Sequence, residues 1–213
     1  MTGRLSDSYF DDMYAASPDP WQLAERWYEA RKYAITMAML PRRRFRHAFE
    51  PGCSVGVLTE MLSQRCDRVT ATDVARVALD SARERLSHGD RFDGVTLLQS
   101  SLDTPWPADV DLVVLSEVGY YLDASSLRAV LARECSRLPG GATLIAAHWR
   151  HRVDDYPLTG DETTDIVAHT PGLHLQARYL DDDVVIGLFS VGATPSVAAS
   201  TEIPGAFNPP EDH

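Results

Sequence analysis

The chain has 213 residues, of which 44% are hydrophobic and 24% charged, a composition that suits one soluble domain with a sizeable core. A formal net charge of -11 argues against nucleic acid or an anionic membrane as the main partner. The odd number of cysteines, 3, without close pairing spacing argues against a disulfide scaffold, and the lack of C-x-x-C spacing argues against a structural zinc site.

The first predicted element is a helix near the N-terminus. Residues 1–17 are polar and are expected to form a flexible N-terminus. In residues 18–40, large side chains recur at helical spacing after Pro20, and Pro41 ends the pattern. The sequence therefore predicts a helix in this stretch, with Trp27 in its buried stripe.

Strand-like and helix-like segments then alternate along the chain. Uninterrupted apolar runs such as LVVL and TLIAA are typical of strands that are buried on both faces. The alternation predicts a parallel sheet with helices on both sides. Strands are predicted at 46–52, 67–74, 95–102, 111–119 and 142–149, and helices at 55–66, 75–88 and 123–138.

The C-terminal part of the chain breaks this alternation. Strand-like runs at 173–180 and 184–191 flank three consecutive aspartates, which predicts a β-hairpin and therefore at least one antiparallel strand. Residues 193–213 are rich in proline and polar residues and are expected to form a flexible tail.

A glycine loop, EPGCSVG at residues 50–56, joins the first predicted strand to the next helix. Gly52 and Gly56 let the backbone approach a ligand closely, beside the free N–H groups of that helix. Ser54 stands where the dinucleotide fingerprint G-x-G-x-x-G needs glycine, so a pyrophosphate site is not provided. Glu50 either holds the loop or faces a positively charged group of the ligand.

Asp73 ends the second predicted strand, about twenty residues beyond the glycines. A carboxylate at this place can accept hydrogen bonds from ribose hydroxyls. It can equally cap the following helix, and both roles stay open at this point. Taken with the glycine loop, it predicts a nucleoside ligand that lacks a pyrophosphate.

The sequence predicts a cytoplasmic protein without a bound metal. The N-terminal stretch MTGRLSDSYFDDMY lacks the apolar segment of a secretory signal, and the longest apolar runs are too short to span a bilayer. The histidines and acidic residues follow no recognised metal-ligand spacing.

Several motifs in this order resemble class I S-adenosylmethionine (SAM)-dependent methyltransferases. They are EPGCSVG, Asp73 after the second strand, DLVVLSEVGYYL, LPGG and the final hairpin, and they span roughly residues 20–192. The resemblance implies an α/β, Rossmann-like fold with seven strands, a mostly parallel sheet, an antiparallel C-terminal strand and an N-terminal helical lid. It also implies SAM as the cofactor and S-adenosylhomocysteine as the product, within one methyltransferase domain at residues 18–192.

A narrower set of motifs is similar to the nodulation protein S (NodS)-like N-methyltransferases. These are DPW…WYEARKYAITMAMLP, FEPGCSVG, SEVGYYL and HWRH…YPLTGDE. Members of that family methylate the amine of a deacetylated chitooligosaccharide, so the resemblance implies a small, sugar-like acceptor with an amine nitrogen.

The resemblance also assigns cofactor-binding residues to this chain. The glycine loop should line the methionine part of SAM, Asp73 should bind the ribose, and the end of the third strand should lie by the adenine. The first helix should fold over the cofactor. The expected cofactor-binding residues are Tyr28, Arg31, Tyr33, Glu50, Gly52, Cys53, Ser54, Gly56, Asp73, Ser101, Leu102 and Ser116.

The acceptor is expected at the ends of the fourth and fifth strands, because such ends meet at the ligand edge of a parallel sheet. We expect Glu117 and His148 to face the acceptor as proton acceptor or orienting groups, with Tyr120 shaping the pocket. Residues 150–173 form a polar insertion that either binds the acceptor or is a solvated loop. The expected substrate-binding residues are Tyr121, Arg150, Asp154 and Asp155.

Other functions remain open from the sequence. One is O-methylation of another small metabolite, and another is a SAM-binding domain without turnover. An NAD-dependent oxidoreductase is disfavoured, because the chain lacks G-x-G-x-x-G and ends in the hairpin.

Overall fold

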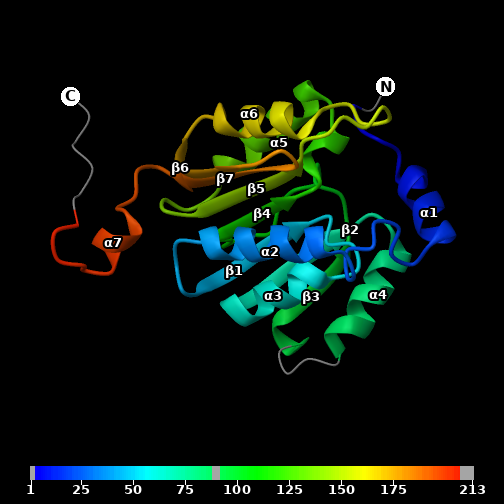
Figure 1. The fold of residues 1–213 in the computed structure, drawn as a ribbon, viewed down its shortest axis with the longest axis horizontal. Helices are drawn as coiled ribbons and strands as arrows, with labels where there is room; N and C mark the ends of the chain where they lie inside the picture. The colour runs from blue at the N-terminus through cyan, green and yellow to red at the C-terminus, as the bar shows by residue number, and fades with distance from the viewer. Residues whose placement is uncertain (1–2, 88–91, 207–213) are drawn as a thin grey trace.

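The computed structural model describes residues 3–87 and 92–206, which form a three-layer α/β domain (Figure 1). Residue 88 of the predicted 75–88 helix lies outside the described residues. The strands are β1 (Phe45–Pro51), β2 (Cys66–Asp73), β3 (Val95–Gln99), β4 (Leu112–Ser116), β5 (Thr143–Trp149), β6 (Leu173–Leu180) and β7 (Val184–Val191). The helices are α1 (Asp7–Ala16), α2 (Trp27–Met39), α3 (Val57–Arg65), α4 (Arg76–Ser87), α5 (Ala124–Cys135), α6 (Gly160–Ala168) and α7 (Val197–Ser200).

The seven strands form one sheet in the order β3-β2-β1-β4-β5-β7-β6. The first five strands are parallel, and β7 runs antiparallel between β5 and β6. Asp181 closes the hairpin, because its carboxylate accepts hydrogen bonds from the N–H groups of Asp183 and Val184. The predicted fold, including the antiparallel strand at the acidic turn, is therefore confirmed.

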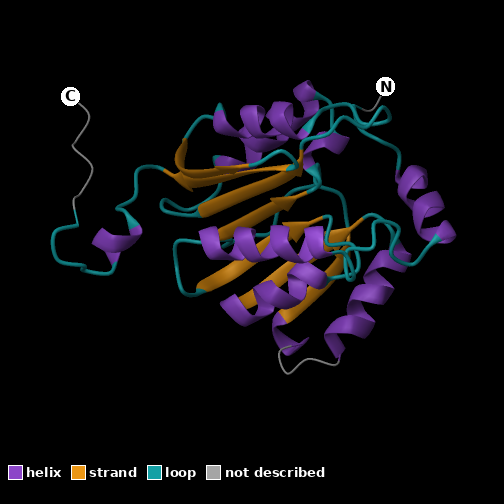
Figure 2. Cartoon of the chain, in the orientation of Figure 1, coloured by secondary structure: helices purple, strands orange, loops and turns teal. Residues whose placement is uncertain are grey.

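Helices cover both faces of the sheet (Figure 2). On one face, Met37 of α2 and Leu62 of α3 pack against buried side chains of β1, β2 and β4. On the other face, Leu131 of α5 and Val167 of α6 pack against the opposite sides of β1 and β4 and against β5. Because β4 is buried on both faces, its sequence reads as a continuous apolar run.

The N-terminal segment is a correction to the expected flexible 1–17 stretch. Ser6 caps α1 by accepting a hydrogen bond from the Tyr9 N–H, and the helix buries Phe10 and Tyr14. These two rings pack against Ala75, Ala78 and Val55, beside the start of α4. Four residues separate the two rings, so they share one helix face among polar neighbours.

The second N-terminal helix is shorter than predicted. It begins at Trp27 rather than after Pro20, since the preceding chain turns around Asp19, whose carboxylate accepts hydrogen bonds from the N–H groups of Leu23 and Ala24. The predicted burial of Trp27 is wrong: its side chain is 78% exposed at the first turn of the helix.

The 150–173 insertion contains a structural helix. Thr159 and Glu162 form a capping box at the start of α6. Ile166 and Val167 of this helix are buried in the core. Residues 150–159 form an irregular loop before this helix and residues 169–172 a turn after it, so the insertion is partly core and partly loop.

Two further features are the C-terminal segment and the lengths of the helices. Residues 193–206 leave the domain and carry the short helix α7, and the rest of the predicted tail lies outside the described residues (Figure 1). Within the described ranges, no helix combines the length and apolar character that crossing a membrane requires.

The start of α6 gives a testable stability prediction. A Cβ at Gly160 would lie 2.1 Å from the carbonyl oxygen of Trp149 and 2.9 Å from the Cβ of His148. We expect Gly160→Ala to lower the free energy of unfolding by about 1–3 kcal/mol, measured by urea denaturation, because the backbone must shift. Gly140→Ala is the control, since its Cβ would meet no atom of the described residues within 4 Å. Equal stability of the two variants would contradict the observed packing.

Candidate active site

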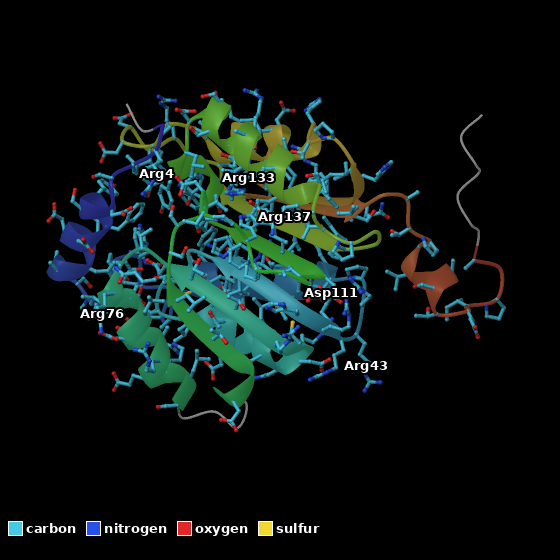
Figure 3. All side chains as sticks on the ribbon, turned by 180° about the vertical axis from the view of Figure 1, so that it is seen from behind. Arg4, Arg43, Arg76, Asp111, Arg133 and Arg137 are labelled. Carbon is cyan, nitrogen blue, oxygen red and sulfur yellow. The ribbon has the colours of Figure 1, made fainter. Side chains whose placement is uncertain are left out.

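A cavity of about 420 Å³ opens at the carboxyl ends of the parallel strands. Its wall includes ends of β1, β2 and β4, the first turns of α2, and aromatic side chains of α1. Cavities of roughly 300–1,000 Å³ are typical of small-molecule sites. Arg4 and α1 lie at this end of the molecule, whereas Arg43 and Asp111 lie at the opposite end (Figure 3).

The arginine-rich run at residues 42–46 serves the fold at that opposite end. The guanidinium of Arg42 bonds Asp111, and that of Arg44 bonds Asp67. Arg46 lies 3.7 Å from the Asp111 carboxylate. These pairs use acidic partners within the domain, so the run gives no reason to place an anionic ligand there.

The glycine loop at the end of β1 has a left-handed backbone at three residues. The φ angles are +72° at Gly52, 49° at Ser54 and +78° at Gly56. A Cβ at Gly56 would lie 2.9 Å from the Cβ of Ala82, so glycine lets α3 start close against α4. At Gly52, a Cβ would lie 3.0 Å from Val118 at the cavity wall.

Asp73 joins the loop to the next helix from the end of β2. Its two carboxylate oxygens accept hydrogen bonds from the N–H groups of Ser54 and Ala75, each at 2.9 Å. The side chain also lines the cavity. The structure thus gives Asp73 a helix-start contact while leaving further acceptor capacity on the cavity side.

Glu50 is a buried carboxyl beneath the same loop, 3% exposed. Thr59 donates a hydrogen bond to it at 2.6 Å. Burial, reinforced by nearby Asp73 and only partly offset by Thr59, raises the pKa of Glu50 to about 8. A positively charged group in the cavity would therefore favour its ionisation.

The raised pKa of Glu50 predicts how stability changes with pH. Below the ordinary value of 4.5, Glu50 is protonated in both the folded and unfolded chain. As pH rises to about 8, only the unfolded chain ionises at this residue, so stability is lost, on the order of 4 kcal/mol. Glu50→Gln cannot titrate, so its stability relative to wild type should increase between pH 5 and pH 8 in urea denaturation. A pH-independent difference would contradict this prediction.

Glu117 lies just beyond the end of β4, with a φ of 56° that is rare for glutamate. Its Oε1 lies 2.7 Å from the Nζ of Lys32, while Oε2 accepts hydrogen bonds from the Tyr120 hydroxyl at 2.6 Å and the Trp149 N–H at 2.8 Å. Burial opposes ionisation, but Lys32 and the hydrogen bonds outweigh it and lower the pKa of Glu117. The site therefore holds a fixed, ionised carboxylate.

The structure brings most of the predicted site residues to the cavity wall. These are Tyr28, Tyr33, Glu50, Gly52, Cys53, Ser54, Asp73, Ser101, Leu102, Ser116, Glu117, Tyr120 and Tyr121. They come from α2 and from the ends of β1, β2 and β4 and the chain after β3, as the carboxyl edge of a parallel sheet requires.

Three predicted residues lie behind the wall or away from it. His148 is fully buried, and its Nε2 accepts a hydrogen bond from the Gly119 N–H at 3.3 Å. Gly56 serves the packing of α3 on α4. Arg31 bonds the Asp181 carboxylate at 2.8 Å and the hydroxyl of Tyr179, which ties α2 to the β6–β7 hairpin.

The predicted acceptor residues of the 150–159 loop also lie outside the cavity wall. Arg150 bonds the Asp161 carboxylate and the Asp181 carbonyl oxygen, so it fastens the loop. The side chains of Asp154 and Asp155 are exposed to solvent. From this loop, Val153 and Tyr156 line the cavity instead.

Sequence reasoning missed an aromatic rim and a charged group. Tyr156 stacks on Tyr120, with ring centroids 4.9 Å apart. Tyr14 of α1 reaches the glycine loop, where its hydroxyl hydrogen-bonds the Ser54 hydroxyl. The spacing of Phe10 and Tyr14 on one helix face was the available signal for α1. Lys32, between Glu29 and Glu117, had none, since an isolated lysine in a helix reads as exposed.

Comparison with known proteins identifies a family for this chain. The family model of nodulation protein S (NodS) matches residues 11–156. The nodulation protein S of Sinorhizobium fredii is 30% identical over 84% of this chain and 86% of its own length. That of Bradyrhizobium diazoefficiens is 33% identical over 65% of this chain and 66% of its own length.

Solved structures share the fold. N-methyltransferase NodS from Bradyrhizobium japonicum WM9, in complex with S-adenosyl-L-homocysteine, superposes with a TM-score of 0.76 at 22% sequence identity, covering 88% of this chain and 99% of that chain. An O-methyltransferase family protein from Burkholderia thailandensis superposes with a TM-score of 0.70 at 13% identity, covering 88% of this chain and 63% of that chain. Since both kinds of protein have this architecture, the fold alone does not select nitrogen or oxygen as the acceptor atom.

Proposed function

The chain belongs to the nodulation protein S (NodS) family, and on this premise we propose that it transfers a methyl group from SAM to an amine nitrogen of a small, sugar-like acceptor. The proposal places the reaction in the cavity at the carboxyl ends of the strands. The observation that carries it is that one cavity holds two features side by side. One is a cradle for a nucleoside, formed by the glycine loop and Asp73, and the other is a buried acidic cluster, formed by Glu29 and Glu117 around Lys32.

The residues of the cradle fit SAM. Gly52 leaves room for close backbone approach, and Asp73 keeps acceptor capacity for ribose hydroxyls. Tyr28 lines the cavity, and its buried hydroxyl has no hydrogen-bond partner among the described residues, which suits a polar ligand. The ionisable Glu50 suits the positive charge of SAM, whose contribution when bound is a methyl group on a sulfonium.

An amine acceptor fits the other half of the cavity. Glu29 and Glu117 place carboxylates on the wall, and Tyr120, Tyr156 and Trp149 surround them with aromatic surface. Carboxylates attract an ammonium group, and aromatic faces suit both cations and sugar rings. The related NodS of B. japonicum is an N-methyltransferase, which agrees with a nitrogen acceptor.

The chain's own groups would act by orienting the acceptor and moving a proton. An ammonium has no lone pair, so an amine must lose a proton before it accepts a methyl group. A carboxylate on the wall can take that proton, and the fixed Glu117 can align the nitrogen. The aromatic side chains and α1 would keep water out of the cavity.

We assign the predicted substrate residues separate roles. Tyr121 contacts the acceptor from the cavity wall. Arg150 supports the 150–159 loop through Asp161, and Asp154 and Asp155 lie on the solvent side, where they reach only the outer part of a longer acceptor. Residues 18–192 remain the proposed catalytic domain, with α1 added as part of its lid.

A methyl-transfer assay on matched acceptors tests this function. The purified chain is incubated with SAM and either glucosamine or glucose, and with chitobiose carrying or lacking one free amine. Mass spectrometry should detect a methyl group only on the free-amine acceptors. Methylation of the hydroxyl analogues alone would favour O-methylation, and SAM binding without transfer to any of a broad amine panel would favour a non-catalytic domain.

A further inference from the structure

Lys32 is an unusually buried lysine behind the cavity wall. Its side chain is 1% exposed, and its Nζ lies 2.7 Å from Glu29 Oε2 and 2.7 Å from Glu117 Oε1. The same nitrogen lies 5.3 Å from the ring centroids of both Tyr28 and Tyr33, within the range of cation–π attraction. Lys32 itself does not line the cavity, whereas both of its carboxylate partners do.

The two carboxylates differ in their surroundings. Glu117 has three donors: Lys32, the Tyr120 hydroxyl and the Trp149 N–H. Glu29 is buried and its Oε2 pairs with Lys32, while no other group in the described part of the chain donates a hydrogen bond to that oxygen. Burial raises the pKa of Glu29, and Lys32 only partly offsets it, while Lys32 and the donors lower the pKa of Glu117. The ammonium group of Lys32 thus lies between Glu117, whose pKa is lowered, and Glu29, whose pKa is raised.

We propose that Lys32 is a positioning residue that fixes Glu117 as a permanent carboxylate and holds Glu29 beside it as the group that takes a proton from the acceptor's ammonium. The proton-transfer part rests on the proposed function, whereas the arrangement of charges does not. Two carboxylate oxygens that share one nitrogen neighbour are close to each other, and without the lysine such a pair repels itself.

The chemistry balances with groups already named. An N–H bond of the acceptor's ammonium breaks, and its proton goes to a Glu29 oxygen. The freed lone pair forms the N–CH₃ bond as the methyl–sulfur bond breaks, and that electron pair stays on sulfur. The methylated amine leaves as an ammonium, and Glu29 returns its proton to water when the product departs.

Other titratable groups face this cluster and belong in the interpretation of any titration. Tyr28 and Tyr33 flank Lys32 on α2, Tyr120 faces Glu117 after β4, and His148 approaches from β5. Burial lowers the pKa of His148 to about 4, and the tyrosine pKa values are raised. Within this cluster, the pKa of Glu29 is therefore expected above its ordinary value of 4.5 and that of Glu117 below it.

The test is an NMR titration of the full chain labelled with ¹³C at the glutamate carboxyl carbons, without SAM or acceptor. Signals are assigned with Glu29→Gln and Glu117→Gln. In wild type, Glu29 should titrate at a higher pH than Glu117. In Lys32→Met, the Glu117 midpoint should rise by about one to three pH units, because its counter-ion is gone. Lys32→Arg should restore a low midpoint.

Two variants keep the test decisive. If Lys32→Met does not fold, the double variant Lys32→Met/Glu29→Gln removes one charge of each sign, and Glu117 should again titrate higher than in Glu29→Gln alone. Arg31→Ala is the matched control on the same helix, since Arg31 pairs with Asp181 away from the cavity and should leave the Glu117 midpoint unchanged. An unchanged Glu117 midpoint without the lysine, or a Glu29 midpoint at or below that of Glu117, would overturn the proposal.

These outcomes are separable from the proposed function. If glucosamine is methylated, the rate of methyl transfer should fall at low pH in wild type. Glu29→Gln should remove this pH dependence, and Glu29→Asp should retain it. If no amine is methylated, the proposed function fails. The NMR titration then decides on its own whether Lys32 gives Glu29 and Glu117 different pKa values.

Discussion

Replacing Asp73 by alanine should weaken the binding of SAM by at least about 100-fold. The carboxylate lies on the cavity wall at the end of β2 and is expected to accept hydrogen bonds from the ribose. Charge-assisted hydrogen bonds contribute about 1.5–3 kcal/mol each, so the loss of two accounts for this factor. Equilibrium dialysis with labelled SAM measures it directly.

The same substitution should also loosen the glycine loop. The buried N–H groups of Ser54 and Ala75 lose their acceptor, which costs about 1–3 kcal/mol of stability for each unpaired donor. Asp73→Asn keeps one acceptor oxygen and the side-chain size, so we expect an intermediate loss of affinity. SAM binding within a few fold of wild type in a folded Asp73→Ala sample would leave Asp73 with only its helix-start role.

Glu117→Gln should lower the rate of methyl transfer by about 100-fold while SAM affinity changes only a few fold. The neutral amide cannot accept from Lys32, Tyr120 and the Trp149 N–H as the carboxylate does. The side chains that shape the acceptor half of the cavity would therefore shift. Single-turnover measurements, with glucosamine or whichever amine proves to be an acceptor, separate this step from binding.

The control for Glu117→Gln is Asp80→Asn, an exposed ion-pair partner of Arg83 on α4. It should leave the rate unchanged. The Glu117 variant should also lose about 3–5 kcal/mol of stability, because the buried Lys32 loses one of its two carboxylate partners among the described residues. A wild-type transfer rate in the folded variant would contradict the role assigned to Glu117.

The central sheet was predictable because its strands have a strong local signal. The strands of Val113 and Ile145, β4 and β5, are buried on both faces of the sheet. Their sequences are therefore short apolar runs, bounded by glycine, proline or charged residues. The glycine loop and Asp73 were also placed correctly at the carboxyl edge, since strand ends and turn residues are local features of the chain.

Features that depend on long-range contacts were not predictable. The helix α1 forms around Phe10 and Tyr14 only because α4 and the glycine loop offer a surface to cover. Trp27 fits the helical stripe in the sequence, yet the helix starts there and turns it outward. Propensity and periodicity carry no information about such partners.

The acidic cluster shows the same limit at the site. Strand-end position predicted both Glu117 and His148 at the cavity, but only Glu117 lines it, and the ring of His148 turns into the core against Gly119. Lys32 and Glu29 lie on a helix distant in sequence from Glu117, so their ion pairs follow from how α2 packs on the sheet. Only the folded chain brings these three charges together.

Calorimetric titration of the wild-type chain with SAM, S-adenosylhomocysteine and NAD tests the proposed cofactor site most directly. We expect saturable binding of the first two at one site per chain, and none of NAD, because Ser54 replaces the glycine that a pyrophosphate site needs. Absence of binding by both SAM and S-adenosylhomocysteine in a folded sample would contradict this expectation and leave the cavity without its proposed ligand.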